Sequence, residues 1–188
     1  LGTLDRANYD AILAELQRIP DKLQEILENR EDIQYFASLY FNRPSMFFIG
    51  RNLDYAVGLE GSLKLKEISY IHSEAYAAGE LKHGTISLIE PGTLVVALAG
   101  CGPLFEKTVS NAVEVKSRGA DVLGLTTRDR AADLSRTADH VIAIPETHPM
   151  LLPSLAVVPM QLFAYYTALQ RGCDIDKPRN LAKSVTVE

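Results

Sequence analysis

The sequence predicts an α/β domain, with a parallel sheet covered by helices on both faces. Four short apolar segments alternate along the chain with longer segments of helical periodicity. Each apolar segment is hydrophobic throughout rather than at every second position, which is typical of strands buried on both faces. Strands and helices that alternate in this way favour a parallel sheet, and they place a ligand site at the carboxyl ends of the strands.

The predicted strands are residues 46–49, 93–99, 121–126 and 140–144. The helical segments are residues 4–40, 54–72, 103–118, 131–136 and 150–170. Pro20 suits the first turn of a second helix better than the middle of one long helix. Asp54 is placed to cap its helix, and Gly119 closes helix 103–118. Pro153 and Pro159 are expected to interrupt the last helix, which ends at Gly172.

Composition excludes several classes of protein. The 188 residues are 47% hydrophobic and 23% charged, as in an ordinary globular domain, and a net charge of −5 gives no reason to expect nucleic acid or an anionic membrane as a partner. No apolar run is long enough to span a bilayer. Cys101 and Cys173 form neither a metal motif nor a disulfide framework, which favours the cytoplasm. Because the chain begins with Leu1 rather than Met, we expect it to be a piece of a longer protein.

One helical segment carries a row of charge. Glu60, Lys64, Glu67 and Ile71 are spaced at i, i+4, i+7 and i+11, so they share one helix face. Such a row is commonly a solvated set of ion pairs. The alternative is a functional site, because this helix follows the first strand and its start should lie at the carboxyl edge of the sheet. By contrast, Gly100-Cys-Gly102 lacks the third glycine and the lysine of nucleotide-binding loops.

Two blocks of sequence resemble the glucosamine-6-phosphate synthases, which are glutamine–fructose-6-phosphate aminotransferases. The first is Lys-Leu-Lys-Glu-Ile-Ser-Tyr-Ile-His at residues 64–72, within a longer match over residues 59–84. The second is the chain end, residues 174–188, which finishes with Asn-Leu-Ala-Lys-Ser-Val-Thr-Val-Glu. The second match is too long to arise by chance in a polar chain end.

The resemblance implies a set of site residues. Lys183 matches the lysine that meets the sugar carbonyl, and Glu67 matches the carboxylate that moves a proton between C1 and C2, with Lys64 beside it. His83 matches the histidine that helps to open the sugar ring and reaches the neighbouring subunit's site, so a homodimer is implied. Ala182 is implied to contact substrate. No metal and no organic cofactor are implied.

The resemblance also implies an architecture. The family's sugar-isomerase (SIS) domains are three-layer α/β/α sandwiches around a five-stranded parallel sheet. Residues 1–40 would then be a helical lead-in, 41–172 the second SIS domain, and 173–188 a tail that closes the active site. The glutaminase and the first SIS domain, which mainly holds the sugar phosphate, are missing, so we expect the chain alone to be inactive. The parent enzyme would convert fructose 6-phosphate and glutamine to glucosamine 6-phosphate and glutamate.

The chemistry fits these residue types. A ketose imine becomes an aldose amine when one base takes a proton from a carbon and returns it to the next, and a carboxylate near a lysine can do this. Lys183 must be neutral to attack a carbonyl, and the nearby cations Lys177 and Arg179 would lower its pKa. Two alternatives remain: another SIS-fold sugar-phosphate isomerase or deglycase, and a non-catalytic sugar-phosphate-binding SIS module. Three further histidines are given structural roles only: His72, His140 and His148.

Overall fold

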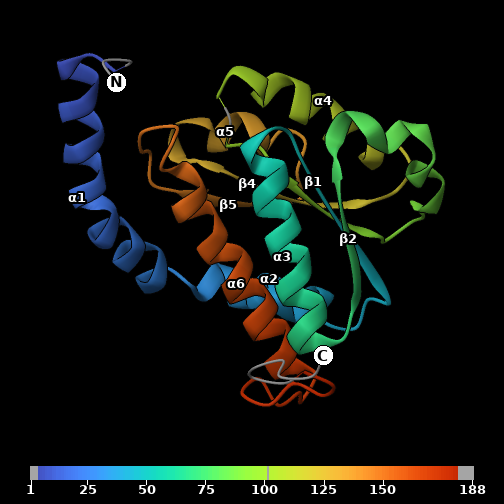
Figure 1. Ribbon diagram of the computed structural model, residues 1–188. Coiled ribbons are helices and arrows are strands. Elements are labelled where there is room, and N and C mark those ends of the chain that lie inside the picture. Colours follow the sequence, from blue (N-terminus) through green and yellow to red (C-terminus); the bar gives the residue numbers. More distant parts are fainter. Residues whose placement is uncertain (1–3, 101, 182–188) are drawn as a thin grey trace, which may run out of the picture.

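The computed structural model describes residues 4–100 and 102–181 of the chain (Figure 1). Within them, five parallel strands form one sheet in the order β2-β1-β3-β4-β5. The strands are β1 (Ser45–Gly50), β2 (His72–Ala77), β3 (Leu94–Leu98), β4 (Asp121–Thr127) and β5 (His140–Ile144). The predicted α/β class and the five-stranded parallel sheet are therefore confirmed.

Helices cover both faces of the sheet (Figure 1). On one face α3 packs against α6, and α6 against α2. The other face is covered by α4 and α5. The helices are α1 (Arg6–Glu28), α2 (Glu31–Tyr40), α3 (Leu53–Ser69), α4 (Phe105–Lys116), α5 (Ala131–Leu134) and α6 (Leu152–Gln170). Four 3₁₀ turns complete the fold: η1 (Ala78–His83), η2 (Thr85–Leu88), η3 (Gly102–Leu104) and η4 (Arg128–Arg130).

The core lies in two layers because strand side chains alternate between the faces. Phe48 and Val96 point into the layer beneath α3 and α6, which also contains Phe163. Their neighbours Phe47 and Val95 point into the layer beneath α4 and α5. Since both layers are apolar, the strands read as continuous hydrophobic runs, as the sequence indicates.

One strand is missing from the prediction. The helix predicted to run to His72 ends at Ser69, and Tyr70 follows in the left-handed conformation, with φ of 62°. His72 then begins β2, at the edge of the sheet, rather than lying on a helix face. Most residues of this strand are half-buried and it begins with His72, Ser73 and Glu74, so it lacks the apolar run of the other four.

The structural roles predicted for Pro20, Pro153, Pro159 and Asp54 are also wrong. Pro20 lies inside a continuous α1, because Ile19 and Ile26 are both buried and their packing holds the helix together across it. Pro153 lies in the first turn of α6, and Pro159 lies within that helix without ending it. The N-cap residue of α3 is Asn52, which precedes the helix, while Asp54 is buried in the first turn.

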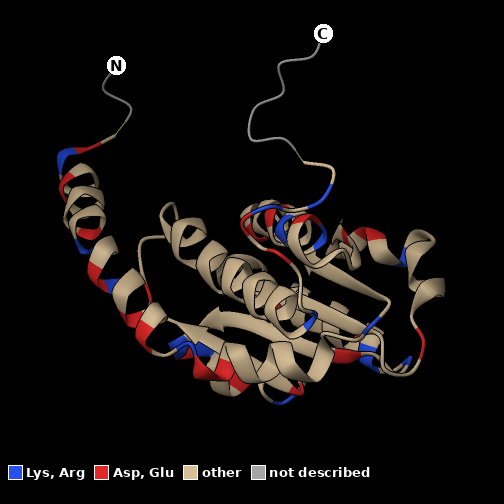
Figure 2. Cartoon of the chain, turned by 90° about the horizontal axis from the view of Figure 1, so that it is seen from below, with Lys and Arg blue, Asp and Glu red and all other residues tan. Residues whose placement is uncertain are grey.

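α6 and α1 differ in how much of their surface is buried. By length and composition alone α6 could span a membrane, but half of its apolar window is buried in this fold, where it packs against α2 and α3. In contrast, α1 extends from the body of the domain and carries charged residues along its length (Figures 1 and 2). Only Ile19 and Ile26 of α1 are buried.

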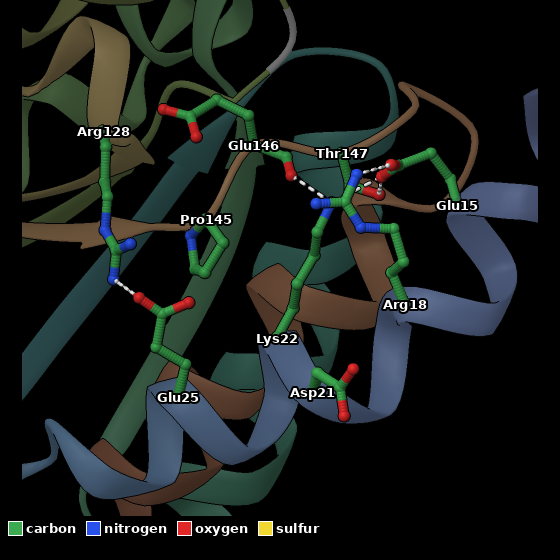
Figure 3. A pocket seen from close by; sticks show the side chains of 9 residues that line it. All are labelled: Glu15, Arg18, Asp21, Lys22, Glu25, Arg128, Pro145, Glu146 and Thr147. Carbon is green, nitrogen blue, oxygen red and sulfur yellow. Dashed lines mark hydrogen bonds and ion pairs between the residues drawn. The ribbon is translucent and has the colours of Figure 1, made fainter.

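Polar contacts hold α1 to the loop after β5 (Figure 3). Glu15 accepts hydrogen bonds from Nζ of Lys22 at 2.5 Å and from the hydroxyl of Thr147 at 2.9 Å. Lys22 also donates to the backbone carbonyl of Glu146 at 2.6 Å. Because little apolar surface anchors α1, these contacts fix where it meets the domain.

Candidate active site

Lys64 and Glu67 form a close ion pair in the second half of α3. Nζ of Lys64 lies 2.6 Å from Oε2 of Glu67, and 3.8 Å from Oε1 of Glu60. The two side chains of the closer pair are 33% and 27% exposed. This partial burial distinguishes the pair from a fully solvated ion-pair row, and it gives Glu67 a fixed cationic partner.

The pair does not lie where the sequence argument expects it. The start of α3 is at the carboxyl edge of the sheet, as predicted, but α3 runs antiparallel to β1 and ends beside the start of β2. Lys64 and Glu67 belong to its last two turns, toward the amino edge. The periodicity therefore identifies their shared face correctly, whereas the expectation that they lie near the carboxyl ends of the strands is wrong.

The described part of the chain end packs against the same end of α3. The backbone N–H of Arg179 donates to the hydroxyl of Tyr70 at 2.9 Å, and the Arg179 guanidinium lies 4.0 Å from the Tyr70 ring centroid. Arg171 donates to the carbonyl of Ser69 at 2.8 Å. The segment around Arg179 is thus bound at Tyr70, three residues beyond Glu67 in the sequence. Lys183 and Ala182 themselves lie outside the described residues.

An apolar groove of about 400 Å³ opens beside the pair, between α1, α3 and α6. Lys64 lies at its rim. The groove is lined by Leu27, Lys64, Ile68, Val158, Gln161, Leu162 and Tyr165. The ion pair therefore stands at the border of an open surface rather than within an enclosed cavity.

The hydrogen bond from Lys64 to Glu67 raises the pKa of Lys64 above its ordinary value, and the carboxylates of Glu67 and Glu60 add to this effect against the opposing influence of burial. Lys64 is consequently protonated at neutral pH. A protonated amine is a hydrogen-bond donor and a counter-ion, but it cannot attack a carbonyl. The arrangement places an ammonium donor directly beside a carboxylate on one helix face.

His83 lies away from this pair. It ends η1, which follows β2 at the carboxyl edge of the sheet, and its side chain is 64% exposed. Its Nε2 lies 3.9 Å from Glu80. Among the described residues no hydrogen bond or ion pair joins His83 to Lys64 or Glu67. One copy of the chain thus presents two of the expected groups together and the third at the opposite edge.

Comparisons with known proteins identify the family of the chain. Residues 39–171 match the SIS domain family. The chain belongs to this family. A glutamine–fructose-6-phosphate aminotransferase (isomerizing) from Caldanaerobacter subterraneus subsp. tengcongensis is 57% identical over 187 residues, which cover 100% of this chain and 31% of that protein. The chain therefore spans about a third of the length of this relative, and the resemblance inferred from the sequence is confirmed.

Solved structures agree with this assignment. The C-terminal domain of glucosamine-fructose-6-phosphate aminotransferase from Francisella tularensis superposes with a TM-score of 0.86 at 31% identity, over 93% of this chain and 49% of that one. Glucosamine-6-phosphate deaminase from Thermotoga maritima superposes with a TM-score of 0.65 at 27% identity, over 92% and 48%. The SIS fold is thus common to proteins whose names specify different reactions on sugar phosphates.

Two contacts of the chain end in this SIS domain escape sequence reasoning. Tyr70 and Arg171 hold the chain end, yet neither has a signal of its own beyond the presence of Tyr70 in the matched block. The other histidines make structural contacts: the ring of His140 lies 4.7 Å from that of Phe36, and Nδ1 of His148 accepts the N–H of Met150. Within the described ranges, no group of three or more His, Cys, Asp or Glu side chains could hold a metal ion.

Proposed function

We propose that this SIS domain is the C-terminal isomerase part of an enzyme that makes glucosamine 6-phosphate and glutamate from fructose 6-phosphate and glutamine. The observation that carries the proposal is the ion pair of Lys64 and Glu67, 2.6 Å apart, at the end of α3 to which the chain end is bound. The relatives that match the whole chain carry the name of this activity.

In the proposed reaction Glu67 is the base. Amination of the ketose at C2 gives an imine, and the change to an aldose needs a proton to leave C1 and another to arrive at C2. A single carboxylate on one face of the sugar can perform both transfers. The ammonium of Lys64 offsets the charge of Glu67 when the carboxylate is ionised, and it stabilises negative charge that develops on the substrate.

We assign the attack on the carbonyl to Lys183. Lys64 is held protonated by Glu67, so it is unsuited to imine formation. Lys183 lies four positions beyond Arg179, a span of at most about 14 Å for an extended chain. Because Arg179 is bound at Tyr70, three residues beyond Glu67, that span is compatible with a shared site. Ala182 would then contact the substrate next to Lys183.

The remaining parts of the site come from elsewhere. We propose that His83 serves ring opening in the site of a second copy, within a cytoplasmic homodimer without metal or organic cofactor. The upstream two thirds of the parent would supply ammonia and the main phosphate contacts, so the chain alone should not turn over. Lost binding energy at the phosphate reduces turnover as well as affinity, since that energy supports chemistry at the reacting carbons.

The test is Glu67→Gln in the full-length parent, with Glu60→Gln as the matched control. Gln keeps the shape of residue 67 but cannot take a proton, so synthesis of glucosamine 6-phosphate should fall by about 10²–10⁴-fold while glutamine hydrolysis continues. Glu60 lies on the same helix face and near the same lysine, at 3.8 Å, so its variant should lose little.

Equal losses in the two variants would mean that the charged row, not a specific base, is required. Near-normal synthesis in Glu67→Gln would mean that Lys64 and Glu67 form a surface ion pair without a catalytic role. A parent that acts on glucosamine 6-phosphate but never consumes glutamine would instead support the alternative of another SIS-fold sugar-phosphate enzyme.

A further inference from the structure

His83 takes its position from the backbone of η1. Its side chain is 64% exposed, and its partner among the described residues is Glu80, which is 71% exposed, with Nε2 of the histidine 3.9 Å from the carboxylate. An exposed pair of this kind holds neither side chain firmly. The contacts that fix η1 on the domain therefore also decide where the His83 ring can reach.

The first of these contacts is apolar. Ala78 and Leu81 of η1 are buried in the core layer beneath α4 and α5, where they are 1% and 2% exposed. η1 also packs against α4 itself. The apolar core thus anchors one side of the turn.

The second contact is made by Arg51, the first residue after β1. A Cβ on Gly79, the second residue of η1, would lie 3.0 Å and 3.3 Å from the two Nη atoms of Arg51. The guanidinium therefore occupies the space that a side chain on Gly79 would need, and it lies directly against the backbone of η1. The lack of a side chain at Gly79 makes this close approach possible.

Arg51 is in turn held by α4. Its Nε and one Nη donate hydrogen bonds to Oδ1 of Asn111, at 3.3 Å and 2.8 Å. A guanidinium is planar and presents its donors in a rigid fork, so two bonds to one oxygen fix its orientation as well as its position. Arg51 thereby links three elements at the carboxyl edge of the sheet: the end of β1, the turn η1 and helix α4.

A second arginine makes a similar contact at the opposite end of β1. A Cβ on Gly92 would lie 3.0 Å from one Nη of Arg43, and this guanidinium pairs with Asp121 at 3.3 Å. The turn that contains Gly92 carries none of the candidate catalytic residues. Arg43 is therefore a matched comparison for Arg51, because it packs on a glycine in the same way without holding a catalytic group.

We propose that Arg51 is a positioning residue for His83, which holds η1 so that the histidine reaches the sugar ring. The inference rests on the ring-opening role proposed above for His83. Ring opening of fructose 6-phosphate breaks the bond between C2 and O5, while the proton of the C2 hydroxyl leaves and O5 gains a proton. A histidine can carry this proton at neutral pH, provided that its ring lies within hydrogen-bond reach.

The first test compares Arg51→Lys with Arg43→Lys in the full-length parent. Lysine keeps the charge but lacks the planar fork. Because a displacement of about 1 Å can cost a catalytic group about 100-fold, kcat of Arg51→Lys should fall by about 10–100-fold, with KM for fructose 6-phosphate nearly unchanged. Arg43→Lys should keep kcat within about twofold of wild type. Near-normal kcat in Arg51→Lys, or equal losses in the two variants, would overturn the proposal.

The second test uses a substrate that needs no ring opening. O6 carries the phosphate, so only the 5-hydroxyl can close a five-membered ring on C2, and 5-deoxyfructose 6-phosphate stays in the open-chain form. With this substrate, wild type, Arg51→Lys and His83→Ala should form amino sugar, measured by mass spectrometry, at rates within about threefold of one another. A loss in Arg51→Lys as large as with fructose 6-phosphate would overturn the proposal. A loss in His83→Ala would instead contradict the ring-opening role of His83.

Discussion

The proposed function gives two different roles to Lys64 and Lys183. The hydrogen bond to Glu67 raises the pKa of Lys64, so its ammonium persists well above neutral pH and it acts through charge. Lys183 follows two cations, Lys177 and Arg179, and positive neighbours lower the pKa of an amine. For this reason we propose Lys183, rather than Lys64, as the nucleophile.

We predict that Lys183 forms a Schiff base with open-chain fructose 6-phosphate in the full-length parent. Borohydride reduction in the presence of substrate, followed by peptide mass mapping, should place the sugar adduct on Lys183. Lys183→Arg keeps the charge but cannot become a neutral amine, so it should fail as completely as Lys183→Ala. An adduct on Lys64, or full activity in Lys183→Arg, would mean that Lys183 does not attack the carbonyl and that the chain end only closes the site.

At this scale the sequence predicts neighbours along a helix better than contacts between distant residues. Lys64 and Glu67 are three residues apart, so helical geometry alone brings them together. Tyr70 and Arg179 are 109 residues apart, and their contact depends on where α6 ends and how α3 is capped. No local pattern encodes that meeting, which is why the anchor of the chain end appears only in the structure.

Among the elements, α1 shows how a helix with little buried surface is positioned by charge. The hydrogen bonds from Lys22 and Thr147 lower the pKa of Glu15 below its ordinary value of 4.5. A lowered carboxylate pKa means that the contacts of Glu15 stabilise the folded arrangement above that pH, and that the contribution is lost as pH falls through the folded-state pKa. Lys22 lies on α1 itself, so docking comes from the Thr147 hydrogen bond to Glu15 and from the hydrogen bond that Lys22 donates to the carbonyl of Glu146. Arg128, which pairs with Glu25, adds a second contact of the same kind.

We predict that acid releases α1 before the rest of the domain unfolds. Hydrogen-exchange protection of amides in Arg6–Glu28 should fall as pH drops below about 4.5, while protection of β3 and β4 persists. Glu15→Gln should show the weakened protection already at neutral pH. Glu28→Gln, on the same helix and outside this network, is the control. If the amides of α1 are as well protected in Glu15→Gln as in the control, the apolar packing of Ile19 and Ile26 is sufficient to hold α1 on the domain.

The elements also show why part of the fold could be predicted. β1, β3 and β4 are buried on both faces, so their apolar runs are visible in the sequence. β5 is an edge strand and only partly buried, but its residues after His140 are all apolar, so it is visible as well. β2 is an edge strand with half-buried polar residues, and its sequence continues the helical pattern of α3 without a Gly or Pro to mark the boundary. The helix ends because Tyr70 adopts the left-handed conformation, and a tyrosine does not predict that conformation.

At the scale of the whole molecule, the expected catalytic groups are divided between two edges of one sheet. Lys64 and Glu67 lie toward the amino edge together with the anchored chain end, and His83 lies at the carboxyl edge beyond β2. β2 runs from the amino edge to the carboxyl edge between the ion pair and His83, so the two lie at opposite ends of this strand. No contact among the described residues joins them. If all three serve one reaction, a second copy of the chain must supply the histidine, which is the central claim of the functional account.

The most direct measurement mixes two inactive full-length variants, Glu67→Gln and His83→Ala, after their subunits are allowed to exchange. In a mixed dimer with shared sites, one site receives both defects and the other receives neither. Half of the dimers in an equal mixture are mixed, so activity should return to about a quarter of the wild-type value. Each variant alone should stay inactive. No recovery in a mixture shown to contain mixed dimers would mean that His83 and Glu67 act within one subunit, and would contradict the account.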